Sequence, residues 1–309
     1  MPELAAGSQL ELHAGKYLVR PRYEVIDSKE NRRIAHVNVH RTDLIPDQNL
    51  LRLKGLVGKG YILAAPILPA NQYDSKVLWT PMATTQNELV ANLTVFDREG
   101  IEMESFPLRF LDRGEAIPIS VTECLRSANS ELLEHCGHME LTYDLANGPE
   151  ADGWMHAIFH YRNTVSGHQA ETSFGSHMFN IPVTYKDQPQ SYTGKPPGLS
   201  TRLYVRLGHP KLDTLLHLIY PASLTWLEKS NTILSLKDGL GREVASHPLQ
   251  IPCGGSRMLS VREIFKTALA ENKNFSGYIS VRDLGCRLFG YHTLVHPKGA
   301  FSLDHMFGF

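Results

Sequence analysis

Along most of this chain, short stretches carry apolar residues at every second position. The clearest covers residues 89–96, and this period of two is typical of a half-buried β-strand. A turn that ends at Gly100 follows it, because glycine takes the positive φ that tight turns need. Residues 101–110 then form the predicted return strand, in which Pro107 indicates an edge position or a bulge.

The same pattern occurs twice, with an offset of 140 or 141 residues. Internal repeats of this kind indicate a duplicated structural unit. The segments 105–108 and 120–123 recur at 246–249 and 260–263. The matched single residues are Pro81 and Pro221, Glu88 and Glu228, Asp97 and Asp238, and Gly100 and Gly241.

Each copy contains the start signal of one short helix. Ser120 is followed three residues later by Glu123, and Ser260 by Glu263. This spacing is a capping box, in which the hydroxyl and the carboxylate satisfy backbone N–H groups at a helix N-terminus. The apolar residues that follow are spaced to give each helix one buried side.

Many short strands, separated by Gly and Pro turns, predict a mainly β fold. We expect two tandem β-sandwich modules, each with one short helix, plus an N-terminal β-hairpin segment. The predicted boundaries are 57–185 for the first module, 186–200 for a Pro/Gly-rich linker and 201–309 for the second module. Residues 1–56 then form a partial module or strands that complete another sheet, with a hairpin turn at 27–31.

Composition is that of a globular chain, with 42% hydrophobic and 20% charged residues in 309. The formal charge of −1 lacks the basic excess of a dedicated nucleic-acid-binding protein, so we expect no nucleic acid as partner. A local basic cluster is formed by Arg20, Arg22, Arg32 and Arg33. It could hold an acidic partner, although a solvated face is the commoner explanation.

The start of the chain lacks a charged region followed by an apolar run, and no apolar run is long enough to span a bilayer. We therefore expect a cytoplasmic protein without membrane insertion. The cysteines do not occupy matching positions in the repeat and form no CxxC pair. This favours reduced thiols at Cys124, Cys136, Cys253 and Cys286.

Familiar catalytic motifs, such as the G-x-S-x-G elbow, the Walker loop and H-E-x-x-H, are missing from the sequence. Candidate chemistry comes instead from histidines at similar places in the two copies. Folding each C-terminal hairpin about its expected turn puts His160 opposite His177, and His292 opposite His305. Opposed residues lie about 5 Å apart at Cβ, close enough to share a ligand or a metal ion.

Two interpretations of these histidine pairs stay open. In the first they are ligand handles, or, as an alternative, a metal site made of His160, His177, His292 and His305. In the second they are hydrogen-bonded residues of an apolar core, which is the commoner role of isolated histidines. Among the tryptophans, Trp226 is placed near a loop where it could stack on a sugar.

The order of strands and turns in each module resembles that of the sensory-rhodopsin transducer family of small β-sandwich proteins. The likeness rests on His160-Tyr-Arg162 through Gln169-Ala-Glu171 in the first copy and on Tyr291-His-Thr293 in the second. It implies an oligomeric, non-enzymatic adaptor or small-ligand binder, and it adds Arg162 to the candidate binding residues. The tandem arrangement and the inserted helix depart from the single-domain family pattern.

The sequence thus favours binding over catalysis, with no cofactor. We expect a binding or adaptor protein for a small ligand, for which a carbohydrate is one option, or for a protein partner, and a homo-oligomer is compatible with this. The alternatives are a metal-dependent enzyme that uses the repeated histidines and a structural oligomer subunit. Metal analysis and a ligand screen separate the three.

Overall fold

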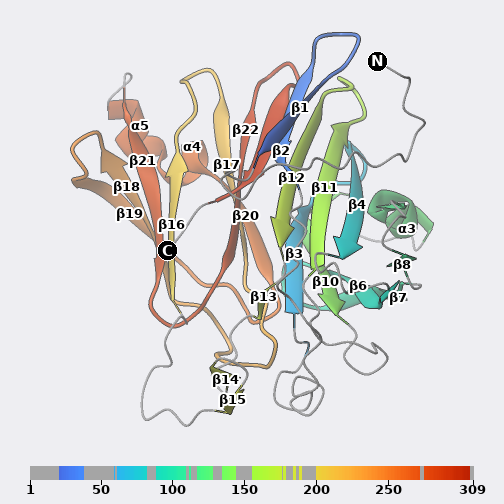
Figure 1. Ribbon diagram of the computed structural model, residues 1–309. Coiled ribbons are helices and arrows are strands. Elements are labelled where there is room, and N and C mark those ends of the chain that lie inside the picture. Colours follow the sequence, from blue (N-terminus) through green and yellow to red (C-terminus); the bar gives the residue numbers. More distant parts are fainter. Residues whose placement is uncertain are drawn as a thin grey trace.

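Both copies of the repeat fold into a sandwich of two antiparallel sheets (Figure 1). The protein is mainly β, as the alternating pattern predicts. The computed structural model describes residues 21–37, 59, 61–81, 88–108, 111–112, 117–127, 134–143, 155–175, 177–178, 184–185, 188–189, 200–271 and 275–306.

Module 1 contains sheet A1, in the order β13-β3-β10-β6-β7, and sheet B1, in the order β12-β11-β4-β9. The strands of these sheets are β3 (Tyr61–Ile67), β4 (Tyr73–Pro81), β6 (Ala91–Phe96), β7 (Glu102–Pro107), β9 (Pro118–Ser120), β10 (Gly137–Tyr143), β11 (Met155–Asn163), β12 (Gln169–Gly175) and β13 (His177–Met178). Two further short pairs are β5 (Glu88–Leu89) with β8 (Leu111–Asp112), and β14 (Thr184–Tyr185) with β15 (Gln188–Pro189).

Module 2 contains sheet A2, in the order β16-β21-β18-β19, and sheet B2, in the order β20-β17-β22-β23. Its strands are β16 (Thr201–Arg206), β17 (Asp213–Ile219), β18 (Thr232–Asp238), β19 (Glu243–Leu249), β20 (Ser256–Ser260), β21 (Gly277–Asp283), β22 (Phe289–Val295) and β23 (Phe301–His305).

The two modules share one strand order. The sequence β3-β10-β6-β7 in sheet A1 corresponds to β16-β21-β18-β19 in sheet A2, and β12-β11-β4-β9 corresponds to β23-β22-β17-β20. The repeat in the sequence is therefore a repeat in the structure. As its proline indicates, β7 is an edge strand, and the corresponding β19 also carries a proline, Pro248, at an edge.

The capping serines begin helices in both modules. Ser120 Oγ accepts a hydrogen bond of 3.3 Å from the N–H of Glu123, before α3 (Val121–Ser127). Ser260 Oγ accepts one of 3.2 Å from the N–H of Glu263, before α4 (Val261–Ile264). The helical segment predicted for module 2 begins at this serine, and it is interrupted at Phe265, after which the chain continues as α5 (Lys266–Glu271).

The N-terminal hairpin forms a two-stranded sheet of its own from β1 (Arg22–Ile26) and β2 (Arg32–His36), with the turn where the sequence places it. It lies against β12, in blue beside green in Figure 1. Ser173 Oγ on β12 donates a 3.0 Å hydrogen bond to the carbonyl oxygen of His36. The hairpin therefore covers part of sheet B1.

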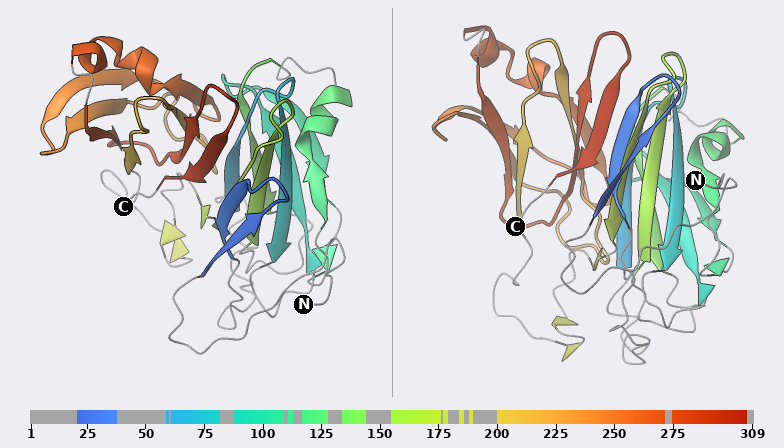
Figure 2. Two further views of the ribbon diagram at one scale, coloured as in Figure 1. Left: turned by 90° about the horizontal axis from the view of Figure 1, so that it is seen from above. Right: turned by 45° about the horizontal axis from the view of Figure 1, so that its top comes forward.

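Sheet B2 of module 2 packs directly on module 1, where it lies against β3, β10 and β12 (Figure 2). Its side chains belong to the same buried cluster as the core of module 1, which burial of apolar surface stabilises. These shared core residues are Ile219, Phe289, Tyr291, Phe301 and Leu303.

Within the described segments, no helix is long and apolar enough to cross a membrane. All four cysteines lie in described segments and are free thiols, as their unmatched positions predict. Trp79 is buried in the core of module 1.

Candidate functional site

The predicted pairing of His292 with His305 is wrong by one residue. On β22 and β23, His292 lies opposite Asp304, and His305 lies opposite Tyr291. The tight turn between the strands closes with a 2.8 Å hydrogen bond from the N–H of His296 to the carbonyl oxygen of Ala300. A slip of one residue moves a side chain to the other face of a sheet, so the two histidines do not face one another.

The predicted pairing of His160 with His177 is also wrong. His160 lies opposite Glu171, because the chain turns back earlier than expected and forms β12 at residues 169–175. His177 belongs to β13, which pairs with β3 in the other sheet. The sequence does contain a pattern that predicts strand β12, because Ala170, Thr172 and Phe174 alternate with polar residues.

The histidines of the two copies do not occupy equivalent positions either. Ser120 and Ser260 are equivalent residues of the repeat. In module 1, Ser120 pairs with Lys76, which pairs on its other side with His160. In module 2, Ser260 pairs with Leu215, which pairs on its other side with Thr293, so Thr293 is the equivalent of His160. Histidines at similar sequence distances are therefore a coincidence of spacing rather than a duplicated site.

One of the candidates, His292, nevertheless lines a hollow together with arginines of the basic cluster, and we call this hollow the hairpin groove. It has a volume of about 300 Å³ and lies where β2, β12 and β23 meet. The hairpin, module 1 and module 2 each contribute to it. Its lining residues are Arg22, Arg32, Arg33, Ile34, Ala35, His36, Gln169, Ala170, Glu171, His292, Phe301, Ser302, Leu303 and Asp304.

The hairpin wall is held by charged hydrogen bonds. Arg33 donates from Nε to Glu171 Oε1 at 2.7 Å and from a terminal nitrogen to Gln169 Oε1 at 2.7 Å. The Tyr23 hydroxyl donates to the other oxygen of Glu171 at 2.9 Å. Burial and the nearby Glu171 carboxylate raise the pKa of Tyr23 well above its usual value, so the phenol stays neutral. His160 Nε2 shares a 2.9 Å hydrogen bond with the same Gln169 oxygen.

Asp304 lines the groove from β23, and its neighbour His305, which is not part of the lining, lies beside it. Asp304 Oδ1 accepts a 2.8 Å hydrogen bond from the hydroxyl of Thr172 and lies 3.1 Å from Nδ1 of His305. Burial favours the neutral acid, but these hydrogen bonds outweigh it and lower the pKa of Asp304. His305 is buried, and its ring packs edge-on against Phe174 with centroids 5.1 Å apart. Its position fits the structural interpretation, because it joins β23 to β12.

His292 differs from His305 in having a buried ring nitrogen without a hydrogen-bond partner among the described residues. This nitrogen is Nδ1, and the side chain is half-buried and lines the groove. Burial lowers the pKa of His292, and the nearby Asp304 carboxylate only partly opposes this. Burial therefore favours the neutral form of this ring, which forms part of the groove lining.

Two of the remaining candidates, Arg162 and Trp226, do not line the hairpin groove. Arg162 is exposed on β11 opposite Asp74, and the side chain of His177 lies outside the described residues. The indole N–H of Trp226 donates a 2.9 Å hydrogen bond to the carbonyl oxygen of Gly285, while the ring packs on the core of module 2. These contacts give Trp226 a structural role.

The sequence signals missed most of the groove. Arg33 belongs to the basic cluster noted in the sequence, but its partners Glu171 and Gln169 are 138 and 136 residues away. Asp304 has no local motif at all. The polar residues of the lining come from three separate segments, so spacing within one segment does not reveal that they meet.

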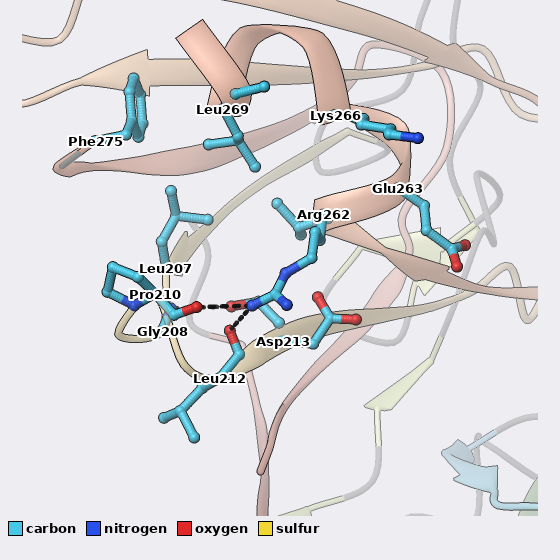
Figure 3. A pocket seen from close by; sticks show the side chains of 13 residues that line it. Leu207, Gly208, Pro210, Leu212, Asp213, Arg262, Glu263, Lys266, Leu269 and Phe275 are labelled. Atoms are coloured by element: carbon cyan, nitrogen blue, oxygen red, sulfur yellow. Dashed lines mark hydrogen bonds between the residues drawn. The ribbon is translucent and has the colours of Figure 1, made fainter. Parts of the chain in front are cut away.

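A second hollow, of about 510 Å³, lies beside the helices of module 2 (Figure 3). Its walls are mostly apolar, with Leu207, Leu269 and Phe275 around it. The guanidinium of Arg262 is used locally, since it donates hydrogen bonds to the carbonyl oxygens of Pro210 at 2.9 Å and Leu212 at 3.2 Å. In module 1, Arg126 of α3 similarly donates to the carbonyl oxygen of Ala70 at 3.2 Å. We therefore interpret this hollow as the packing interface between α4 and the loop around Pro210 that its arginine holds.

A buried polar cluster lies between the modules. Lys59 Nζ is 2.6 Å from Glu140 Oε2, and the other Glu140 oxygen lies 3.6 Å from Nε2 of His138. Nδ1 of His138 is 3.2 Å from Ser256 Oγ in module 2. Burial alone would raise the pKa of Glu140, but the His138 imidazole and the Lys59 ammonium outweigh it and lower that pKa. Glu140 and His138 are fully buried, so this serine, histidine and carboxylate array serves the interface.

Within the described segments, no group of three or more His, Cys, Asp or Glu side chains is arranged to hold a metal ion. The histidine-based metal site thus gains no support from these residues. No protein-family model matches the chain, and a search of curated proteins gave no match. The likeness to sensory-rhodopsin transducers stays a prediction.

Proposed function

We propose that this chain is a non-enzymatic binding protein that takes a small polyhydroxylated ligand, such as a carbohydrate, in the hairpin groove. The observation that carries this proposal is the convergence of planar polar side chains from three parts of the fold on one hollow of about 300 Å³. Binding pockets for small molecules commonly lie where structural units meet.

The groove offers donors and acceptors that suit neighbouring hydroxyl groups. Arg22 and Arg32 supply N–H donors, Asp304 and Glu171 supply acceptors, and His292 supplies a ring nitrogen. A hydroxyl both donates and accepts, so one sugar hydroxyl can bridge an acid and a guanidinium. The Phe301 ring adds an apolar surface to the lining.

The acids of the groove are better suited to holding a ligand than to moving protons. Asp304 and Glu171 already accept hydrogen bonds from Thr172, Arg33 and Tyr23. Such bonds hold the two carboxylates in place. A general acid would need a raised pKa, whereas the pKa of Asp304 is lowered.

A thermal-shift and calorimetric screen of mono- and disaccharides and polyols tests the proposal. We expect at least one ligand to stabilise the wild type, and Ser302→Trp to abolish its binding, because Ser302 is an exposed part of the lining. Ser276→Trp, at an exposed position outside the groove, should bind as the wild type does. His292→Gln should weaken binding, whereas His247→Gln, at another half-buried histidine, should not.

Three results would contradict the proposal. One is a screen without any binder, and another is a ligand whose affinity ignores Ser302→Trp. The third is stoichiometric tightly bound transition metal in the purified wild type, which would favour the metal-dependent alternative. A chain that binds nothing but forms a stable oligomer in solution would favour the structural subunit.

A further inference from the structure

The repeat exposes one sheet face in module 2 whose counterpart in module 1 is covered. Sheet A1 is packed on its outer face by sheet B2, which lies against β3 and β10. Sheet A2 has the same strand order, but its outer face carries the exposed positions of β16 and β18. We call this open surface the A2 face.

The side chains at equivalent positions differ in chemistry. Ile62, Ala64 and Pro66 on β3 are buried under module 2. The residues 140 positions later, on β16, are Arg202, Tyr204 and Arg206. Covered apolar positions in one copy are thus charged and aromatic in the other, where water reaches them.

The strand register brings the positive charges together. Arg202 lies directly opposite Arg282, and Tyr278 lies between Arg206 and Lys237. Like charges on directly opposed residues destabilise a sheet. Within the part of the chain that the structure describes, Lys237 has an ion-pair partner, Glu243 at 3.1 Å, and the three arginines have none. The A2 face is therefore set up for an anionic partner.

The A2 face also carries exposed aromatic and aliphatic side chains. Tyr204 is 47% exposed, and its ring lies 6.0 Å from that of Tyr278. Ile233, which is 46% exposed, lies opposite the exposed Pro248 on β19. The two tyrosines thus lie among the arginines of β16 and β21, and Ile233 lies beside them on β18. Mixed arginine, tyrosine and aliphatic surfaces are typical of protein interfaces, whereas nucleic acid calls for a charge along its whole path.

We propose that the A2 face is a docking surface for an acidic polypeptide segment that carries apolar side chains between its carboxylates. The guanidinium groups of Arg202, Arg206 and Arg282 pair with the carboxylates, since arginine binds carboxylate in a planar two-pronged geometry. The tyrosines and Ile233 receive the apolar side chains. None of these residues lines the hairpin groove, so this surface is independent of the proposed small-ligand site.

Fluorescence anisotropy with the full chain tests this surface. The probe is a labelled peptide in which Glu and Leu alternate, and the control peptide has Gln in place of Glu. We expect the Glu peptide to bind at least about tenfold more tightly, and its binding to weaken as salt is added. The double variant R202E/R282E should lose the peptide. The matched control K211E/K298E changes the net charge equally at exposed lysines outside the face and should retain it.

Circular dichroism and the melting temperature show whether charge reversal impairs folding. If it does, the variant R202Q/R282Q, which removes the two charges without reversing them, is used to test peptide binding. Equal binding of the two peptides, or equal loss of binding in R202E/R282E and K211E/K298E, would overturn the proposal. An oligothymidylate that binds more tightly than the Glu peptide, and is lost in R202E/R282E, would assign the surface to nucleic acid instead. Failure of the saccharide screen would leave these outcomes unchanged.

Discussion

The hydroxyl of Tyr291, on β22 of module 2, donates a 2.6 Å hydrogen bond to the carbonyl oxygen of Ala64, on β3 of module 1. Both residues are fully buried, and they lie 227 residues apart in the chain. The bond joins two sandwiches whose apolar side chains form one cluster. We therefore expect the modules to unfold together rather than one after the other.

Replacing Tyr291 by Phe should destabilise the protein by about 1–3 kcal/mol, because the buried Ala64 carbonyl oxygen loses its partner. Urea denaturation, followed by fluorescence and by circular dichroism, measures this change. The variant Tyr204→Phe, at an exposed tyrosine, should stay within about 0.5 kcal/mol of the wild type. Two separate transitions in the wild type would show that the modules are not coupled.

Gly100 tests how closely the modules approach one another. It has a φ of +87°, and an added Cβ would lie 2.8 Å from the carbonyl carbon of Gly254 in module 2. Gly167 has a φ of +73°, but an added Cβ would meet nothing within 4 Å. Gly167→Ala should therefore cost about 1–2 kcal/mol from the left-handed backbone alone. Gly100→Ala should cost clearly more in thermal and urea denaturation, and equal losses would contradict the close approach.

His217 should contribute to acid destabilisation. It is buried, and burial lowers its pKa to about 4, compared with about 6.5 in an unfolded chain. Between these pH values the unfolded state binds more protons, so the free energy of unfolding falls as the pH falls. Since one pKa unit corresponds to about 1.4 kcal/mol, this site accounts for up to about 3 kcal/mol.

The variant His217→Leu should therefore lose less stability between pH 6.5 and pH 4 than the wild type does, as measured by urea denaturation at a series of pH values. His209→Leu, at an exposed histidine, provides the matched control. If the free energy of unfolding fell equally between pH 6.5 and pH 4 in His217→Leu and in the wild type, His217 would not titrate in this way.

The architecture could be predicted because it depends on local sequence motifs and on an internal repeat. The capping serines Ser120 and Ser260, the turn glycine Gly100 and the edge proline Pro107 all depend on nearby residues. Because the pattern is duplicated, each strand could be located in two equivalent segments of the sequence. The shared strand order of the two modules follows from this.

The candidate site could not be predicted in the same way. The pairing of His292 depends on the length of one turn, and a difference of one residue replaces His305 by Asp304. The groove also needs Arg33 from the hairpin to meet Glu171 on β12, and sheet B2 to bring Asp304 beside them. These contacts depend on how whole sheets pack, for which the sequence offers no local sign.

A crystal structure with the saccharide or polyol that gives the largest thermal shift would test the central claim most directly. We predict that the ligand lies in the hairpin groove, with hydroxyl groups within hydrogen-bond distance of His292, Asp304 and an arginine of the hairpin. A ligand bound elsewhere, such as in the hollow beside Arg262 and Leu269, would contradict the assignment of the groove as the binding site.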